Sequence, residues 1–219
     1  MTIGMILLII TAILILLGVG QRVLDRLRLN DKLALIFIAL IIGLGFVPDV
    51  RVTELFTFNL GGALIPLILC VYLFFKADTA WEKWRSILAS LVTGAAIFAI
   101  SRFAPDEPEA MLFDPILLYG LAAGLIAYIF GRSRRCAFIA GVIGMMLSDV
   151  LNAASVWMRG IPQELNLGGA GAADAIVIAG LLAVLLAELL GELFERMKRG
   201  TQRPTRTFRN GEFVKEENA

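Results

Sequence analysis

Two aspartates, Asp149 and Asp174, lie inside long apolar stretches of the sequence, where carboxyl groups are rare. An ionisable side chain in hydrocarbon usually faces a partner or a cavity, so it marks a functional site by default. Two carboxyl groups held close in a low-dielectric site cannot both ionise easily, so such a pair shares a proton. One carboxylate can then take a proton from water while the other, protonated, polarises a peptide carbonyl. The two residues are therefore candidates for a catalytic pair.

The spacing around Asp149 predicts a helix with one small and polar face. Steps of three or four residues align side chains on one face, and the aligned residues are Gly141, Gly144 or Met145, Ser148, Asp149, Asn152, Ser155 and Arg159. Asp149 lies about ten residues before Arg159, and Asp174 about eight residues after Asn166. At 1.5 Å per residue, these offsets put the carboxyl groups about 15 Å and 12 Å from the outer boundary. We expect similar depths on consecutive antiparallel helices, with Ser148 and Asn152 as supporting residues.

A glycine-rich segment precedes Asp174. It begins at Asn166 and contains Gly168, Gly169 and Gly171. Glycines allow a substrate backbone to approach closely and let the start of a helix open locally. We therefore expect these four residues to bind substrate or to support the site.

The motif Asn-Leu-Gly-Gly-Ala occurs twice, at residues 59–63 and at residues 166–170. Both copies begin a predicted helix at the same face, which suggests two parallel three-helix repeats joined by a central helix. This 3+1+3 arrangement adds Asn59, Gly61 and Gly62 to the candidate binding residues. The simpler alternative is a capped helix start with close packing and a tolerated proline, Pro66.

The composition predicts a membrane protein with an all-α fold. Of its 219 residues, 58% are hydrophobic, whereas soluble domains contain about 45–50% apolar residues. A spanning helix needs about 20 mostly apolar residues. Seven stretches qualify or nearly qualify: 3–20, 33–48, 60–76, 86–102, 114–131, 136–158 and 168–193. The first has neither a basic start nor a cleavage site, so it is interpreted as a retained helix and not as a signal peptide.

The distribution of basic residues predicts the orientation of these helices. Lysine and arginine collect on the cytoplasmic side of a membrane. They concentrate after the first, third, fifth and seventh stretches, at Arg22, Arg26, Arg28, Lys32, Lys76, Lys83, Arg85, Arg132, Arg134, Arg135 and seven positions from Arg196 to Lys215. The sequence therefore predicts an outside N-terminus and a cytoplasmic C-terminus. Residues 1–199 form the transmembrane domain, and residues 200–219 form a flexible cytoplasmic tail.

Several classes of function are disfavoured. The net charge of +1 is spread over short clusters between apolar runs, so no basic face for nucleic acid is expected. The chain has no histidine, which removes histidine-based general base chemistry and most zinc or haem sites. Cys70 and Cys136 occupy unrelated surroundings and are expected to be free thiols. The sequence predicts no metal and no cofactor, and it predicts membrane lipid as a partner.

Two resemblances add to these expectations. Aspartates on successive membrane helices, the second in Gly171-Ala-Ala-Asp174 before an apolar run, resemble the Gly-x-Gly-Asp intramembrane aspartyl proteases, which include presenilin, signal peptide peptidase and prepilin peptidase. This resemblance covers the last two helices, and Ala173 replaces the second glycine. It implies a membrane-embedded peptide as substrate. The segments at residues 59–66, 148–152 and 168–174 together resemble a family of multi-pass bacterial and archaeal proteins of unknown function, which implies a prokaryotic plasma membrane.

The residues leave three functional hypotheses open. The first is an intramembrane aspartyl protease that uses Asp149 and Asp174. The second is a proton- or cation-coupled small-solute transporter with its site between the two repeats. The third is a non-catalytic scaffold that binds a partner through its polar face. Asp149 also has a purely structural interpretation, as a neutral acid that hydrogen-bonds Asn152 or a neighbouring helix.

Overall fold

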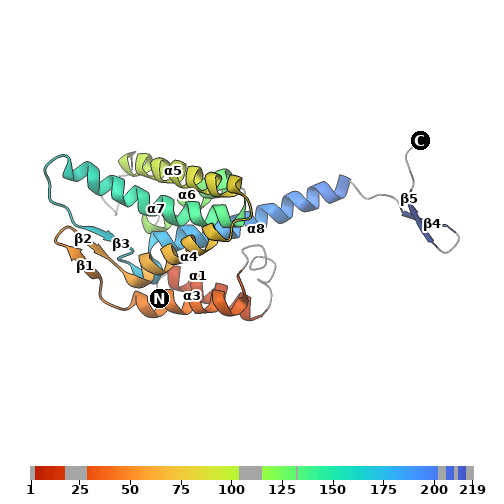
Figure 1. Ribbon diagram of the computed structural model, residues 1–219, viewed down its shortest axis with the longest axis horizontal. Coiled ribbons are helices and arrows are strands. Elements are labelled where there is room, and N and C mark those ends of the chain that lie inside the picture. Colours follow the sequence, from red (N-terminus) through yellow and green to blue (C-terminus); the bar gives the residue numbers. More distant parts are fainter. Residues whose placement is uncertain are drawn as a thin grey trace.

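The computed structural model describes residues 3–17, 29–103, 115–131, 133–201, 206–209 and 212–215. Most of these residues are helical (Figure 1). The elements in chain order are α1 (Ile3–Leu16), α3 (Asp31–Gly45), β1 (Val50–Thr53), β2 (Phe56–Phe58), the π-helical turn η1 (Leu60–Leu64), α4 (Ile65–Phe75), α5 (Ala80–Phe103), α6 (Pro115–Gly131), α7 (Arg134–Trp157), β3 (Leu165–Leu167), the 3-10 turn η3 (Gly171–Ala173), α8 (Ala175–Thr201), β4 (Arg206–Arg209) and β5 (Glu212–Lys215).

Each of the seven apolar stretches coincides with one α-helix of the described residues. The α-helical starts differ from the predicted ones at both glycine-rich motifs. The third stretch begins as the π-helical turn η1, and the seventh becomes α-helical only at Ala175. By length and composition, α5 and α7 could each cross a membrane, and the other apolar helices are shorter. The prediction of a helical protein is thus confirmed, and that of membrane association is supported by two helices.

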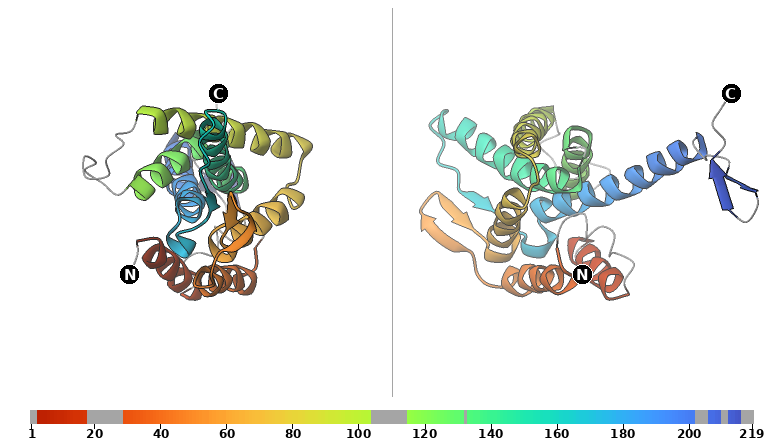
Figure 2. Two further views of the ribbon diagram at one scale, coloured as in Figure 1. Left: turned by 90° about the vertical axis from the view of Figure 1, so that its left-hand side faces the viewer. Right: turned by 45° about the vertical axis from the view of Figure 1, so that its right-hand side comes forward.

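Small residues allow the long helices to pack closely. A side-chain carbon added at Gly144 of α7 would lie 2.7 Å from the Thr93 side chain of α5, and one added at Gly141 would lie 2.8 Å from the carbonyl oxygen of Ala179 in α8. Close contact between helix backbones is the usual basis of helix association in lipid. The bundle that results is seen from two sides in Figure 2. It fixes α7 and α8, which carry the two aspartates, against each other.

A small sheet lies at one end of the bundle (Figure 1). Its strand order is β1-β2-β3, with β1 and β2 antiparallel and β2 and β3 parallel. The all-α prediction included no strands, and these have only three or four residues each. Strand β3 pairs with a segment more than a hundred residues earlier, Phe56 with Leu165. Sequence periodicity does not report such a pairing, because it reflects local burial only.

Charged side chains gather at the opposite end of the bundle. Arg135 of α7 forms ion pairs with Asp78 at 2.6 Å and with Glu82 at 3.3 Å, and Arg134 pairs with Glu188 of α8. The side chain of Ser133 accepts a hydrogen bond from the backbone N–H of Cys136 and so caps the start of α7. This end corresponds to the basic loops of the sequence. Residues 18–28, 104–114 and 132, which carry part of that charge pattern, lie outside the described residues.

The segment predicted to be a flexible tail has some regular structure. Helix α8 continues to Thr201, and β4 pairs with β5 as an antiparallel hairpin. Its flexibility and its cytoplasmic location remain predictions.

Candidate functional site

The first glycine-rich motif begins a helix through the side chain of Asn59. Its Oδ1 accepts hydrogen bonds from the backbone N–H groups of Gly61 and Gly62, both at 2.9 Å. Asparagine is a favoured N-cap because its oxygen satisfies donors that have no partner within the helix. The capping interpretation of Asn59 is thus confirmed, and the first turn adopts a π-helical form that is often found at functional sites.

The two copies of the motif lie in direct contact. The backbone N–H of Asn59 donates to the carbonyl of Leu167 at 2.9 Å and extends the parallel pairing of β2 and β3. A side-chain carbon at Gly168 would lie 2.5 Å from the backbone N of Ala63, and one at Gly62 would overlap the carbonyl oxygen of Gly168. The register pairs Thr57 with Asn166, so the copies are shifted by two residues from exact alignment. Gly62 and Gly168 must therefore be glycine, because the two backbones lie too close together to leave room for a side chain.

Asp49 connects the two motifs. Its Oδ1 accepts a hydrogen bond from Nδ2 of Asn59 at 2.8 Å, and its Oδ2 accepts one from Nδ2 of Asn166 at 2.7 Å. A carboxylate with two amide donors forms charge-assisted hydrogen bonds, which are stronger than neutral ones. Asp49 thus holds together the starts of two segments that are distant in sequence. Asp49 is not among the site residues predicted from the sequence.

The end of α3 lies between the two motifs. Side-chain carbons at Gly61 and Gly171 would each meet Gly45, the latter at 2.8 Å from its carbonyl oxygen. Gly171 also has a φ of +58°, which favours glycine. Gly45 was not predicted as a site residue. For Asp49 a signal was available, since Ile42-Gly43 leading to Pro48-Asp49-Val50 loosely resembles Ile143-Gly144 leading to Ser148-Asp149-Val150.

Asp174 is the residue directly before α8. Its carboxylate accepts hydrogen bonds from the backbone N–H of Ile176 at 2.9 Å and of Ala170 at 3.2 Å. A carboxylate at a helix N-terminus is stabilised by these donors and by the helix dipole. The glycine-rich segment before it forms a turn and then η3, so the seventh helix is unwound over this segment.

Asp149 is partly buried in α7, and Asp174 is partly buried directly before α8, the helix against which α7 packs. Within the part of the chain that the structure describes, no hydrogen bond to the Asp149 carboxyl group is recorded. One acid of the pair is therefore held by backbone donors, whereas the other remains available to a ligand.

The remaining predicted site residues have different neighbours. Asn152 accepts a hydrogen bond through its Oδ1 from the Ser101 hydroxyl of α5 at 3.1 Å. The Ser148 hydroxyl is buried and donates to the carbonyl of Met145 within the same helix at 2.9 Å. Gly169 is exposed and lies against the side chain of Asn166. Asn152 thus connects α7 to α5 and Ser148 packs within α7, and among the described residues neither is seen to hydrogen-bond Asp149 or Asp174.

The loss of the Asn59 cap should be measurable. Asn59→Ala removes the acceptor for two backbone N–H groups, so we expect the free energy of unfolding to fall by about 1–2 kcal/mol. Asn59→Ser keeps an oxygen acceptor but loses the amide donor to Asp49. Its free energy of unfolding should therefore fall by less than that of Asn59→Ala. Denaturation of the purified proteins in detergent measures both. An Asn59→Ala protein as stable as wild type would contradict the capping role.

Among the described residues, no group of three or more Cys, Asp or Glu side chains is arranged to hold a metal ion. Asp49 is instead engaged with two side-chain amides, and Asp174 with two backbone donors. What this arrangement can do chemically is exchange protons and polarise a carbonyl between Asp149 and Asp174.

Comparison with known proteins identifies the family. No curated protein and no solved structure matches the chain. A family model described as "Protein of unknown function (DUF1614)" matches residues 8–186, which include both glycine-rich motifs and all three aspartates of the site. The chain therefore belongs to the DUF1614 family of proteins of unknown function.

Proposed function

We propose that the protein is an intramembrane aspartyl protease with Asp149 and Asp174 as its catalytic pair. The close packing of α7, which contains Asp149, against α8, which begins directly after Asp174, is the observation that carries the proposal. Paired acids in a partly buried site share a proton, as the chemistry requires.

The surroundings of the two acids suggest which role each has. Asp174 accepts two backbone hydrogen bonds that stabilise its carboxylate form, so it is the base that removes a proton from water. Among the described residues none hydrogen-bonds the Asp149 carboxyl group, so in its protonated form Asp149 donates a hydrogen bond to the carbonyl oxygen of the scissile peptide. The water oxygen then bonds to the carbonyl carbon. The C–N bond breaks as the proton taken by Asp174 passes to the leaving amine.

The setting that we propose is a prokaryotic plasma membrane. All seven α-helices would cross it, with the N-terminus outside and the C-terminus in the cytoplasm. The charged cluster around Arg134 and Arg135, at the end of the bundle opposite the small sheet, supports this orientation because arginine collects on the cytoplasmic side.

Co-expression with a single-span reporter protein tests the proposal. The reporter carries a different epitope tag on each side of its span, and immunoblots of the membranes detect its fragments. Wild type should produce fragments and Asp174→Asn should not, since an amide cannot act as the base. Glu164→Gln, a substitution at an exposed acid in the loop after α7, is the matched control and should cleave normally.

Asparagine can still cap α8, so we expect wild type and Asp174→Asn to reach equal levels in the membrane. Equal levels would show that the substitution leaves folding unaffected. Equal fragment yields from wild type and Asp174→Asn would overturn the proposal.

The bridge formed by Asp49 favours a second candidate, a proton- or cation-coupled transporter. Asp49 bonds to both Asn59 and Asn166, so a proton or cation bound to its carboxylate would weaken the connection between the two motifs. Discontinuous helices that meet at a repeat interface are typical of such transporters. Solute uptake into proteoliposomes that is driven by a pH gradient and lost in Asp49→Asn would support this alternative over proteolysis.

A further inference from the structure

A groove between α4, α5 and α7 is lined mostly by apolar side chains. The two serines in its lining use their hydroxyl protons within α5, since Ser86 donates to the carbonyl of Lys83 and Ser90 donates to that of Ser86, both at 2.8 Å. Several apolar residues that line the groove are also exposed, namely Val71, Phe75, Ile87 and Leu91. The groove therefore opens to the surroundings of the bundle, and its lining suits a hydrocarbon chain.

One end of the groove carries an ammonium group. Lys83 lies in the first turn of α5, and it precedes Ile87 and Leu91 by one and two steps of four residues. This spacing puts the three side chains on one helical face. The Nζ of Lys83 lies 5.9 Å from the ring centroid of Phe74, which itself lines the groove. A positive charge thus lies next to the apolar lining.

Positive charge is unmatched at this end of α4 and α5. The carboxylates of Asp78 and Glu82 both pair with Arg135. Within the part of the chain that the structure describes, Lys83 and the exposed Lys76 form no ion pair, and each ammonium lies over an aromatic ring of α4. A phosphate group is complementary to these lysines. The amine of a zwitterionic head group would instead meet carboxylates that are already paired.

Two tryptophans support a membrane boundary at the same place. Trp81 and Trp84 lie in the first two turns of α5 and are 72% and 63% exposed. Tryptophan is enriched in the head-group layer of membranes, and α5 is long and apolar enough to cross one. With the boundary at these residues, Lys83 lies at the level of the lipid phosphates and the groove lies in hydrocarbon.

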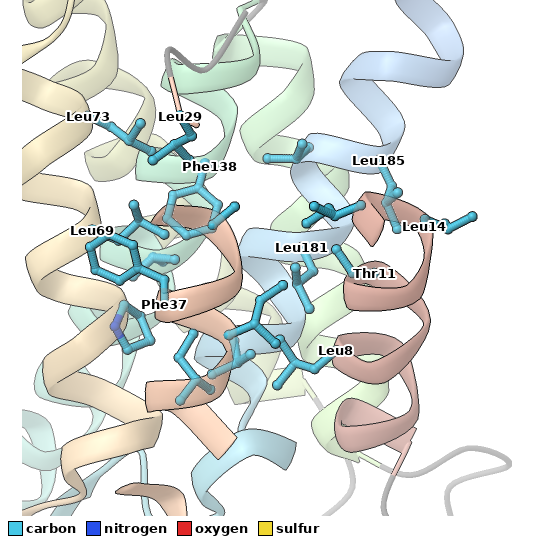
Figure 3. A pocket seen from close by; sticks show the side chains of 18 of the residues that line it. Leu8, Thr11, Leu14, Leu29, Phe37, Leu69, Leu73, Phe138, Leu181 and Leu185 are labelled. Atoms are coloured by element: carbon cyan, nitrogen blue, oxygen red, sulfur yellow. The ribbon is translucent and has the colours of Figure 1, made fainter. Parts of the chain in front are cut away.

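Another apolar groove, between α1, α3, α4, α7 and α8, differs in its charge. Figure 3 shows leucine and phenylalanine side chains that line it, among them Leu69, Leu73 and Phe138. The charged residue in its lining, Glu188, is paired with Arg134 and so offers no unmatched charge to a head group. Charge complementarity therefore favours the groove beside Lys83 as a lipid site.

We propose that the groove between α4, α5 and α7 binds an anionic phospholipid. The phosphate lies at Lys83, and one acyl chain lies along the exposed apolar residues of α4 and α5. This assignment rests on the membrane setting proposed above, but it does not require that the protein cleave peptides.

Photocrosslinking of the purified full chain in nanodiscs of phosphatidylcholine tests the assignment. The probe is a small fraction of phosphatidylglycerol, or of phosphatidylcholine in a parallel sample, with a diazirine on one acyl chain. Mass spectrometry locates the labelled residues. The phosphatidylglycerol probe should label the groove several-fold more than the phosphatidylcholine probe does, at Phe75, Ile87 and Leu91.

Variants of Lys83 test the place of the head group. Lys83→Gln should reduce labelling by phosphatidylglycerol about fivefold, the loss expected for one lysine near an anionic lipid surface. Lys83→Arg keeps the charge and should retain the labelling. The matched control Arg51→Gln removes an exposed basic side chain in β1 and should leave the labelling unchanged.

Other labelling patterns would overturn the proposal. Equal labelling by the two probes would exclude selection of an anionic head group, and this comparison needs only the wild type if Lys83→Gln does not fold. Label spread evenly over exposed positions such as Leu121 of α6 would indicate bulk lipid. A groove that neither probe labels would indicate a different occupant, such as a second copy of the chain. Because no readout involves cleavage, an inactive but correctly labelled protein would separate this proposal from the protease.

Discussion

Gly168→Ala is expected to lower the free energy of unfolding by about 3 kcal/mol or more, as unusually severe substitutions do. Two causes add at this position. The φ of +72° costs a residue with a side chain about 1–2 kcal/mol. The added carbon would also lie 2.5 Å from the backbone N of Ala63 and from the carbonyl carbon of Gly62. Backbone atoms cannot rotate away, so the two motifs must separate.

Gly160→Ala separates these two causes. Gly160 has nearly the same φ, +76°, but no atom lies within 4 Å of the added carbon. Gly160→Ala should therefore lower the free energy of unfolding only by the conformational cost of about 1–2 kcal/mol. Denaturation of both variants in the same detergent gives the two losses of unfolding free energy. The difference between them measures what the contact between the motifs contributes to stability. Equal losses would show that this contact contributes nothing to stability.

The helices could be predicted from the sequence because an apolar run is a local property. The stretch at 136–158 corresponds closely to α7, and that at 114–131 to α6. The predicted start at residue 168 was wrong by seven residues, since α8 begins at Ala175. An apolar run does not distinguish helix from turn where glycines interrupt it. Positive φ at Gly168 and Gly171 ends any helical geometry there.

The site could be predicted only in part. Asp149 and Asp174 were predicted as site residues because carboxyl groups stand out in apolar sequence, and their catalytic role stays a prediction. The capping by Asn59 could be predicted because a cap lies next to the helix that it begins. Asp49 was missed because its partner Asn166 is 117 residues away and the bond depends on the pairing of β2 with β3. Recurrence of a motif indicated which segments correspond, but it did not indicate that they touch.

Contact between the motifs gives the proposed catalytic pair a rigid support. Asp174 ends a glycine-rich segment that packs on Gly62 and Gly45, and this segment is held to Asp49 through Asn166. Catalytic groups must be kept within a fraction of an ångström of their working geometry by surrounding contacts. Substitutions at Asp49 are therefore expected to act on the site through the position of Asp174.

Asp149→Asn and Asp174→Asn should each reduce cleavage of the single-span reporter by about 10²–10⁴-fold, the usual contribution of general acid–base catalysis. The double variant should lose no more than either single variant. Residues that act as one unit are strongly non-additive, because the first substitution already removes the shared proton. Initial cleavage rates of purified wild type and the three variants in the same lipid measure this.

Independent roles would give a different pattern of rates. If Asp174 served only as the cap of α8, its substitution by asparagine would preserve the cap and leave cleavage intact. If Asp149 only packed against a neighbouring helix, its effect would appear in stability and would add to that of Asp174. The comparison of the two single variants with the double variant thus tests the feature on which the protease proposal depends, namely that the two carboxyl groups hold one proton between them.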